Sequence, residues 1–169
     1  MNMSPGLRKF VLAVHLTVSV GWIGAVVAYL ALDITAVTSQ DVQLVRSAYL
    51  AMDLTVSYAI VPLALAALLT GLIMSLGTPW GLFRHYWVLI SFVLTIFAAV
   101  VLLLETQTIS YMAQVAASGA DPRNLPGSLP HSVGGLLVLL VITVLNVYKP
   151  RGLTPYGWRK LQEERRRRG

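Results

Sequence analysis

The sequence contains no cysteine and few charged side chains. The absence of cysteine excludes disulfides, thiolate metal sites and cysteine nucleophiles together. Charged residues make up 12% of the 169 positions and hydrophobic residues 56%, whereas a soluble domain carries about 25% charge. The mean hydropathy is +0.71. A chain with so little polar surface is expected to reside in a membrane. It also has no phosphate-binding loop and no HExxH zinc motif, so the hydrolase classes that depend on them are not indicated.

Four long apolar runs predict the fold. They cover about 10–32, 54–76, 86–108 and 131–148, and a helix needs about 20 residues to cross the hydrocarbon core. The first run is too long and too uniform for a cleaved signal peptide, and no small-x-small cleavage site follows it. We therefore expect an all-α, four-transmembrane-helix bundle, with 1–169 as a single membrane domain that ends in a basic tail at 149–169.

The distribution of basic residues predicts the orientation. Of the thirteen lysines and arginines, eleven lie on one side if both termini share it, and only Arg46 and Arg123 lie on the other. Because cytoplasmic segments carry the excess of basic residues, both termini are expected in the cytoplasm of a bacterial cell, with the chain in its cytoplasmic membrane. The basic residues flank apolar runs instead of covering a soluble face, so a nucleic-acid partner is not expected.

Two segments outside the spans have recognisable signals. Ser39 is a candidate helix cap, and the second helix is expected to begin near Gln40, before the span itself. Near the end of the chain a cluster of four arginines is expected to attract anionic lipid, because it would lie beside the cytoplasmic leaflet. These arginines are Arg165, Arg166, Arg167 and Arg168.

His15 is the histidine that lies deepest within a span. It follows Lys9 by six residues, which places it about 9 Å below the cytoplasmic boundary. Trp22 lies on the same stripe of the first helix, and several polar residues of other helices reach the depth of His15. These are Thr70, Ser91, Thr143 and Asn146. We expect an inner polar pocket in which His15 faces the bundle and hydrogen-bonds a hydroxyl, an amide or a backbone carbonyl. His85 is shallower and is expected at the membrane interface.

The opposite side of the bundle has a second group of ionisable residues. Glu105, His131 and Asp53 occur near the ends of different helices, and Asp33 lies close to another end. Carboxylates with one imidazole suit a divalent cation, and Met52 and Met112 would suit copper(I). In the alternative interpretation these charges face water and cap the bundle.

One motif of the first span resembles a known group. In "VHLTVSVGWIGA", His15 is followed after six residues by Trp22 and then by Gly24, and this pattern resembles the first helix of the CopD copper-resistance and HemJ protoporphyrinogen-oxidase group. That resemblance implies haem b bound by His15 and a lysine of the third helix; Ser91 stands where that lysine is expected. "GTPWGLFRHYWVL" and "VYKPRGLTPYGWRK" resemble a family of small bacterial four-helix membrane proteins for which no activity is established.

Three functions fit these observations. The first is a non-enzymatic membrane protein that binds a small ligand or assists a partner, either a membrane protein or a second copy of the chain. The second is a haem b or quinone-linked redox protein with His15 as axial ligand, in which case the chain would be a membrane oxidoreductase. The third is a metal or small-solute transporter with His15 and Glu105 as inner and outer stations. We favour the first because it needs no ligand that the sequence lacks.

Overall fold

A computed structural model describes residues 3–125 and 127–167, so Arg168 of the arginine cluster lies outside the described residues. The described chain is almost entirely helical, which confirms the expected all-α class, and its β pairing is one isolated bridge between His85 and Leu153. The elements are α1 (Pro5–Thr38), α2 (Val42–Thr55), the π-helix η1 (Val56–Ile60), α3 (Val61–Gly77), α4 (Tyr86–Ala117), the 3₁₀-helix η2 (Pro122–Asn124), α5 (Leu129–Tyr148) and α6 (Pro155–Arg166).

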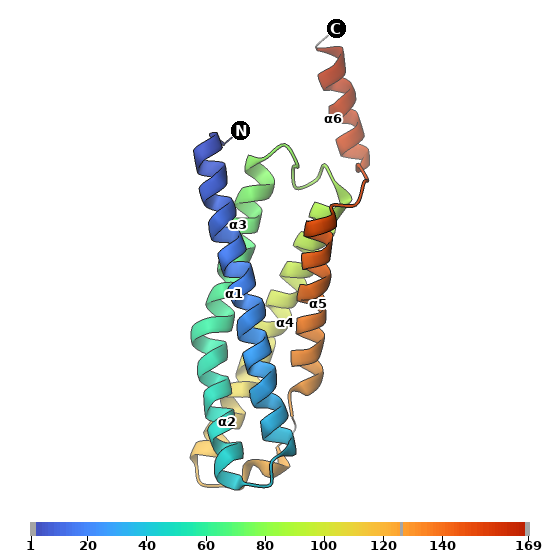
Figure 1. The fold of residues 1–169 in the computed structure, drawn as a ribbon. Helices are drawn as coiled ribbons and strands as arrows, with labels where there is room; N and C mark the ends of the chain where they lie inside the picture. Colours follow the sequence, from blue (N-terminus) through green and yellow to red (C-terminus); the bar gives the residue numbers. More distant parts are fainter. Residues whose placement is uncertain (1–2, 126, 168–169) are drawn as a thin grey trace.

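Four helical segments are long and apolar enough to cross a membrane: α1, the continuous α2–η1–α3, α4 and α5. They form a bundle in which α1 and α4 each pack against both the α2–α3 segment and α5. The fold is that of a multi-pass integral membrane protein. Both termini lie at one end of the bundle (Figure 1), which we call the termini end. The opposite end, with the connections 39–41 and 118–128, is the loop end.

The helix lengths show which part of the bundle matches a bilayer. The 20 residues of α5 extend about 30 Å, the thickness of a hydrocarbon core. α1 and α4 have 34 and 32 residues and extend beyond the predicted spans. The residues of α1 and α4 that extend beyond the predicted spans lie mainly at the loop end, where both helices continue past the start of α5 (Figure 1).

The start of α2 differs from the expectation. α2 begins at Val42 and its cap is Asp41, whose Oδ1 accepts hydrogen bonds from the backbone N–H groups of Gln43 (2.8 Å) and Leu44. Ser39 instead ends α1, and its hydroxyl accepts from the Asp41 N–H. Asp41 has the extended backbone typical of a helix cap, so its carboxylate lies over the free N–H groups of the first turn.

A π-helix interrupts the second membrane segment. The Val61 N–H bonds to the Val56 carbonyl, five residues back, and Pro62 follows directly. Proline has no N–H and its ring clashes with the preceding turn, and a widened turn is one of the usual ways in which a helix accommodates such an interruption. The π-helix thus lets one continuous segment cross the bundle.

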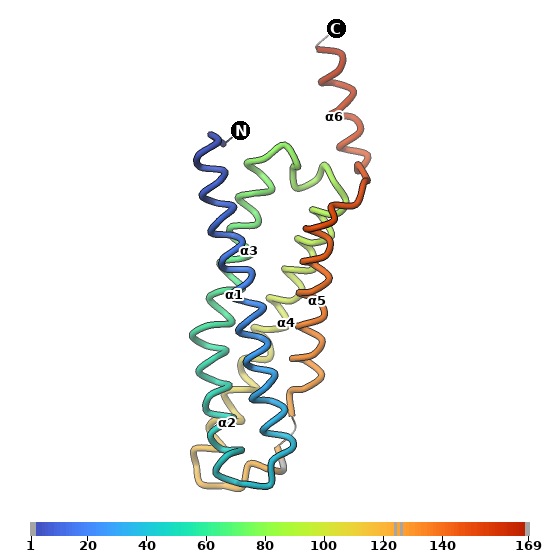
Figure 2. Tube along the Cα trace, viewed as in Figure 1, coloured from blue at the N-terminus to red at the C-terminus, as the bar shows by residue number. Residues whose placement is uncertain are grey.

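Packing is tight in the loop half and sparse in the termini half. The fully buried side chains Val45, Tyr49, Met52 and Val56 all belong to the core of the loop half. In the termini half, the described residues form one small separate hydrophobic cluster, Leu82, Trp87 and Val88. In Figure 2, α1 and α5 separate toward the termini end.

The last helix is held against the connection between α3 and α4. Thr154 caps α6 and also donates to the Phe83 carbonyl (2.5 Å), while its N–H bonds to the Arg84 carbonyl (3.1 Å). Arg84 in turn makes two hydrogen bonds to the carboxylate of Glu164, at 3.1 and 2.9 Å. α6 extends away from the bundle (Figure 1), and the Arg84–Glu164 contact tethers it close to the arginines at its end.

The loop end is closed by an ion pair and two contacts to the backbone. Arg123 binds Asp121 at 2.6 Å and also reaches the Gln40 carbonyl, and Arg46 donates to the Ala120 carbonyl. The hydrogen bonds from Arg123 lower the pKa of Asp121 to about 2, so the pair stays charged at neutral pH. These contacts join the loop after α1 to the loop after α4.

Candidate functional site

A large cavity lies in the sparsely packed termini half, and we call it the termini cavity. Its volume is about 740 Å³, and α1, α3, α4 and α5 all contribute to its wall. The pocket residues expected from the sequence (Ser91, Thr143, Asn146 and Trp22) all line it together with His15. Of the polar residues that the sequence places at one depth, His15, Ser91, Thr143 and Asn146 line this space, whereas Thr70 does not.

His15 makes the hydrogen bond expected of it, and the bond determines which ring nitrogen carries the proton. Its Nδ1 lies 2.9 Å from the Thr70 hydroxyl. That hydroxyl donates its own hydrogen to the Ala66 carbonyl at 2.7 Å, so it accepts from His15. In neutral His15 the proton is therefore on Nδ1, which leaves a lone pair on Nε2. The ring lies against Gly71, where an added Cβ would be 3.2 Å from Cε1.

A second polar contact crosses the cavity between α4 and α5. The Asn146 amide donates to the Ser91 hydroxyl (3.1 Å) and to the Ile142 carbonyl (2.7 Å), and Thr143 donates to the Leu139 carbonyl. These side chains hold one another and stiffen the wall. His85 is not part of the cavity: its Nδ1 lies 2.6 Å from the Trp80 carbonyl and its ring contacts Trp80 and Trp87.

The mouth of the termini cavity is positively charged. Arg8, Lys9 and Lys149 line it, and none of its described lining residues is acidic. The Lys149 ammonium lies 5.2 Å from the centre of the Trp80 ring, a cation–π contact that holds it at the interface. The mouth therefore favours an anionic group, and the interior beyond it is mostly apolar.

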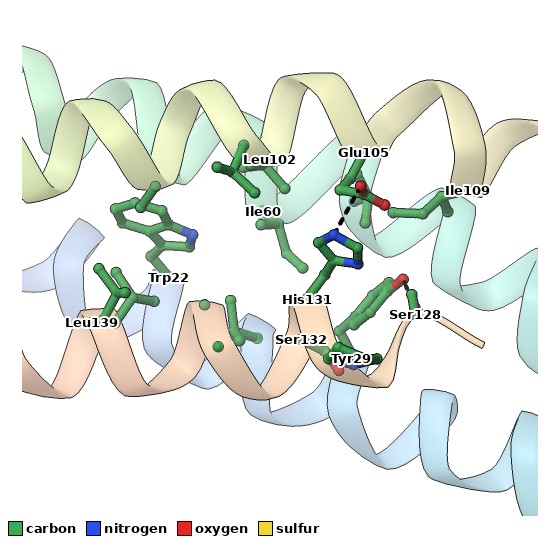
Figure 3. A pocket seen from close by; sticks show the side chains of 18 of the residues that line it. Trp22, Tyr29, Ile60, Leu102, Glu105, Ile109, Ser128, His131, Ser132 and Leu139 are labelled. Atoms are coloured by element: carbon green, nitrogen blue, oxygen red, sulfur yellow. Dashed lines mark hydrogen bonds and ion pairs between the residues drawn. The ribbon is translucent and has the colours of Figure 1, made fainter. Parts of the chain in front are cut away.

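A second, smaller space lies in the loop half, and we call it the loop pocket. It has a volume of about 250 Å³ and lies between α1, α4 and α5. Figure 3 shows Glu105 and His131 facing each other across it, with Nε2 of His131 3.2 Å from Oε1 of Glu105. Trp22 and Leu139 lie at its other end (Figure 3).

The predicted metal-binding residues come together only in part. Glu105 and His131 are in contact, but Asp53 accepts a hydrogen bond from Ser110 at 2.7 Å and does not line the loop pocket. Within residues 3–125 and 127–167 no three His, Asp or Glu side chains are grouped as a metal site would need. Met52 and Met112 are 0% and 2% exposed and belong to the core.

Asp33 has a place that sequence reasoning missed. The sequence placed it near a helix end, either beside a cation site or facing water, yet it is 0% exposed. Its carboxylate accepts hydrogen bonds from the Ser128 N–H (3.3 Å), the Ser128 hydroxyl (2.9 Å) and the Ser132 hydroxyl (2.8 Å), and Tyr29 bonds to the same Ser128. Asp33 thus caps α5 from another helix, where its charge meets the positive end of the helix dipole. The two serines beside the start of α5 were the available signal, but nothing in the sequence connects them to Asp33.

Comparison with known proteins gives no relative: no family model, curated protein or solved structure matches the chain. The resemblance of the His15–Trp22–Gly24 pattern to the CopD and HemJ group therefore stays a prediction.

Proposed function

We propose that the chain is a non-enzymatic integral protein of a bacterial cytoplasmic membrane that binds an amphipathic, anionic molecule of the lipid class in the termini cavity. The observation that carries the proposal is the combination of a basic mouth with a largely apolar interior in one space of about 740 Å³. Basic pockets between membrane helices on the cytoplasmic side are a known arrangement for acidic lipid head groups.

The proposal includes the orientation of the chain in the membrane, with both termini in the cytoplasm. Both termini lie at the end with the basic mouth, and eleven of the thirteen basic residues belong to that side. The positive-inside rule assigns this end to the cytoplasm. The ligand's acidic group would then bind at the cytoplasmic interface. The arginine cluster of α6 is a less suitable place for it, because α6 extends away from the bundle (Figure 1).

Removing the charge of the mouth is expected to weaken binding of an anionic lipid. The probe is a fluorescent short-chain phosphatidylglycerol, titrated against the full-length protein in detergent, with the phosphatidylcholine analogue for comparison. Each basic residue near a membrane surface contributes about 1 kcal/mol, so Lys149→Gln should raise the Kd about fivefold. The triple variant with Arg8→Gln and Lys9→Gln should raise it about 100-fold.

Arg159→Gln is the matched control for the mouth variants, because Arg159 is an exposed residue of α6 outside the cavity. It should leave the Kd unchanged. Equal affinity of the wild type for the two lipids, or an equal loss in the Arg159 variant, would contradict the proposal.

Haem b is a second candidate ligand, favoured by the unprotonated Nε2 of His15. A histidine whose Nδ1–H is already bonded is arranged as metal-ligating histidines usually are, and haem propionates would suit the basic mouth. The fit is incomplete, since His15 is the only histidine among the described lining residues. When bound, haem would supply redox chemistry, and His15 would hold its iron from one side.

The haem candidate predicts a specific spectrum. Protein purified from cells supplied with haem precursor should show a reduced-minus-oxidised haem b signal that His15→Ala abolishes and His85→Ala leaves intact. A colourless wild type, or a signal that survives His15→Ala, would eliminate this site.

A further inference from the structure

The termini cavity and the loop pocket meet at two side chains. Trp22 and Leu139 are the only described residues that line both spaces. They are 4% and 5% exposed, so they fill the junction and separate the two spaces. Figure 3 shows the Trp22 ring and Leu139 facing each other at the end of the loop pocket away from Glu105 and His131.

This junction lies midway along the helices that are long enough to cross a bilayer. Leu139 is ten residues after the first residue of α5, which has 20 residues, and is therefore about 15 Å from either end of that helix. Trp22 is likewise near the middle of α1, which covers Pro5–Thr38. Each space therefore lies within one leaflet. The termini cavity extends from one membrane interface to the midplane, and the loop pocket extends from the midplane toward the opposite interface.

Both spaces border the lipid-facing surface of the bundle. Leu16, Val20 and Val147 line the termini cavity and are 55%, 68% and 69% exposed, which places its side opening between α1 and α5. Phe97 lines the loop pocket and is 57% exposed, on the side where α4 meets α5. A lipid chain can thus remain in the bilayer while its head group occupies either space.

The two spaces also have polar groups at their outer ends and along the path. The termini cavity offers the basic mouth and, deeper, the hydroxyls of Ser19, Ser91 and Thr95. The loop pocket ends at His131, which pairs with Glu105, and at Ser128 and Ser132, whose hydroxyls donate to Asp33. A head group passing the junction would leave one polar set and meet the other.

We propose that these two spaces form a passage by which a lipid-like anionic amphiphile moves between leaflets, and that Trp22 is its gate. The inference rests on the proposed function, because it takes the ligand of the termini cavity as the molecule that moves. Passage requires the Trp22 ring to swing away from Leu139, which joins the two spaces into one. No bond is made or broken.

Transbilayer exchange of a fluorescent lipid tests the gate. The full chain is reconstituted into phosphatidylcholine vesicles that contain a trace of nitrobenzoxadiazole-labelled short-chain phosphatidylglycerol, and dithionite bleaches the label in the outer leaflet. With the wild type, the protected fluorescence should be lost faster than in protein-free vesicles. Trp22→Ala should speed the loss severalfold, because the junction is then open.

A second variant keeps the test decisive if Trp22→Ala does not fold. Leu139→Phe adds bulk at the same junction and should slow exchange below the wild-type rate. Trp158→Ala is the matched control, because Trp158 is an exposed tryptophan of α6, and it should exchange like the wild type. A wild-type rate equal to that of protein-free vesicles, or junction variants that exchange at the wild-type rate, overturns the gate.

Binding and exchange can fail separately. If the junction variants and the wild type bind phosphatidylglycerol with the preference proposed above and yet none accelerates exchange, the gate is wrong and the proposed ligand class stands. If the wild type binds both lipids equally, the proposed function fails, and the passage fails with it.

Discussion

Asp33→Ala is expected to destabilise the protein more than any other carboxylate substitution in the bundle. The change removes the acceptor of three hydrogen bonds and leaves the Ser128 N–H unpaired in a buried place, while the two hydroxyls keep only their contacts with Tyr29 and the Leu129 carbonyl. Hydrogen bonds to a charged group contribute about 1.5–3 kcal/mol each, and they are not additive. A loss of about 3–5 kcal/mol is therefore expected. In a chain of this size that corresponds to a Tm lower by about 10 °C, measured by thermal unfolding in detergent.

Asp53→Ala is the comparison for Asp33→Ala. Asp53 is only half-buried, and its carboxylate accepts a hydrogen bond from the Ser110 hydroxyl at 2.7 Å, so its loss should cost about 1 kcal/mol. Asp33→Asn keeps an acceptor oxygen and should fall between the two. Equal Tm values for Asp33→Ala and Asp53→Ala would show that Asp33 does not hold the start of α5.

Gly157→Ala is expected to detach α6 from the connection between α3 and α4. A Cβ at this position would lie 2.3 Å from the backbone oxygen of Arg84, and backbone atoms cannot move aside cheaply. Alanine favours a helix over glycine by about 1 kcal/mol, so helix propensity alone predicts the opposite sign. We expect the clash to prevail, and the Thr154 and Glu164 contacts to be lost with it.

Hydrogen exchange followed by mass spectrometry measures this effect. Peptides that cover 82–88 and 152–160 should exchange at least about tenfold faster in Gly157→Ala, as expected for local opening. Gly152→Ala is the control, because its Cβ would lie 3.5 Å from the Tyr86 ring, an ordinary contact, and it should exchange like the wild type. Slower exchange in Gly157→Ala would mean that helix propensity outweighs the clash.

The membrane helices and the depth of each residue along them could be predicted from the sequence, because both depend only on residues that are close together in the chain. Hydropathy over about 20 residues is enough to identify a membrane helix, and the rise per residue places His15, Ser91 and Asn146 at one depth. The bundle class and the shared lining of those residues follow from these two rules. A hydrogen bond from His15 to a hydroxyl, an amide or a carbonyl could be expected, because a buried imidazole needs a partner. The sequence did not identify which residue this partner is.

The contacts that were missed join distant parts of the chain. Asp33 and Ser128 are separated by 95 positions, and Thr154 and Phe83 by 71, so no local pattern connects them. The sequence indicated residues that line the termini cavity, but the size of that cavity was missed for a related reason. An empty space is set by how far helices separate, as α1 and α5 do toward the termini end (Figure 2), and hydropathy carries no information on that distance.

The π-helix η1 has a consequence for the rotational phase of α3. A π-helix contains one residue more than the α-helical turn it replaces, and one residue corresponds to a rotation of about 100°. If the same residues were wound as a regular α-helix, the extra residue of 56–60 would turn every later side chain of α3 by that angle. Thr70 and Gly71, which hold the ring of His15, would then face away from α1. The wider turn thus lets Thr70 and Gly71 face His15 while Tyr49 and Met52, earlier in the same segment, remain in the core.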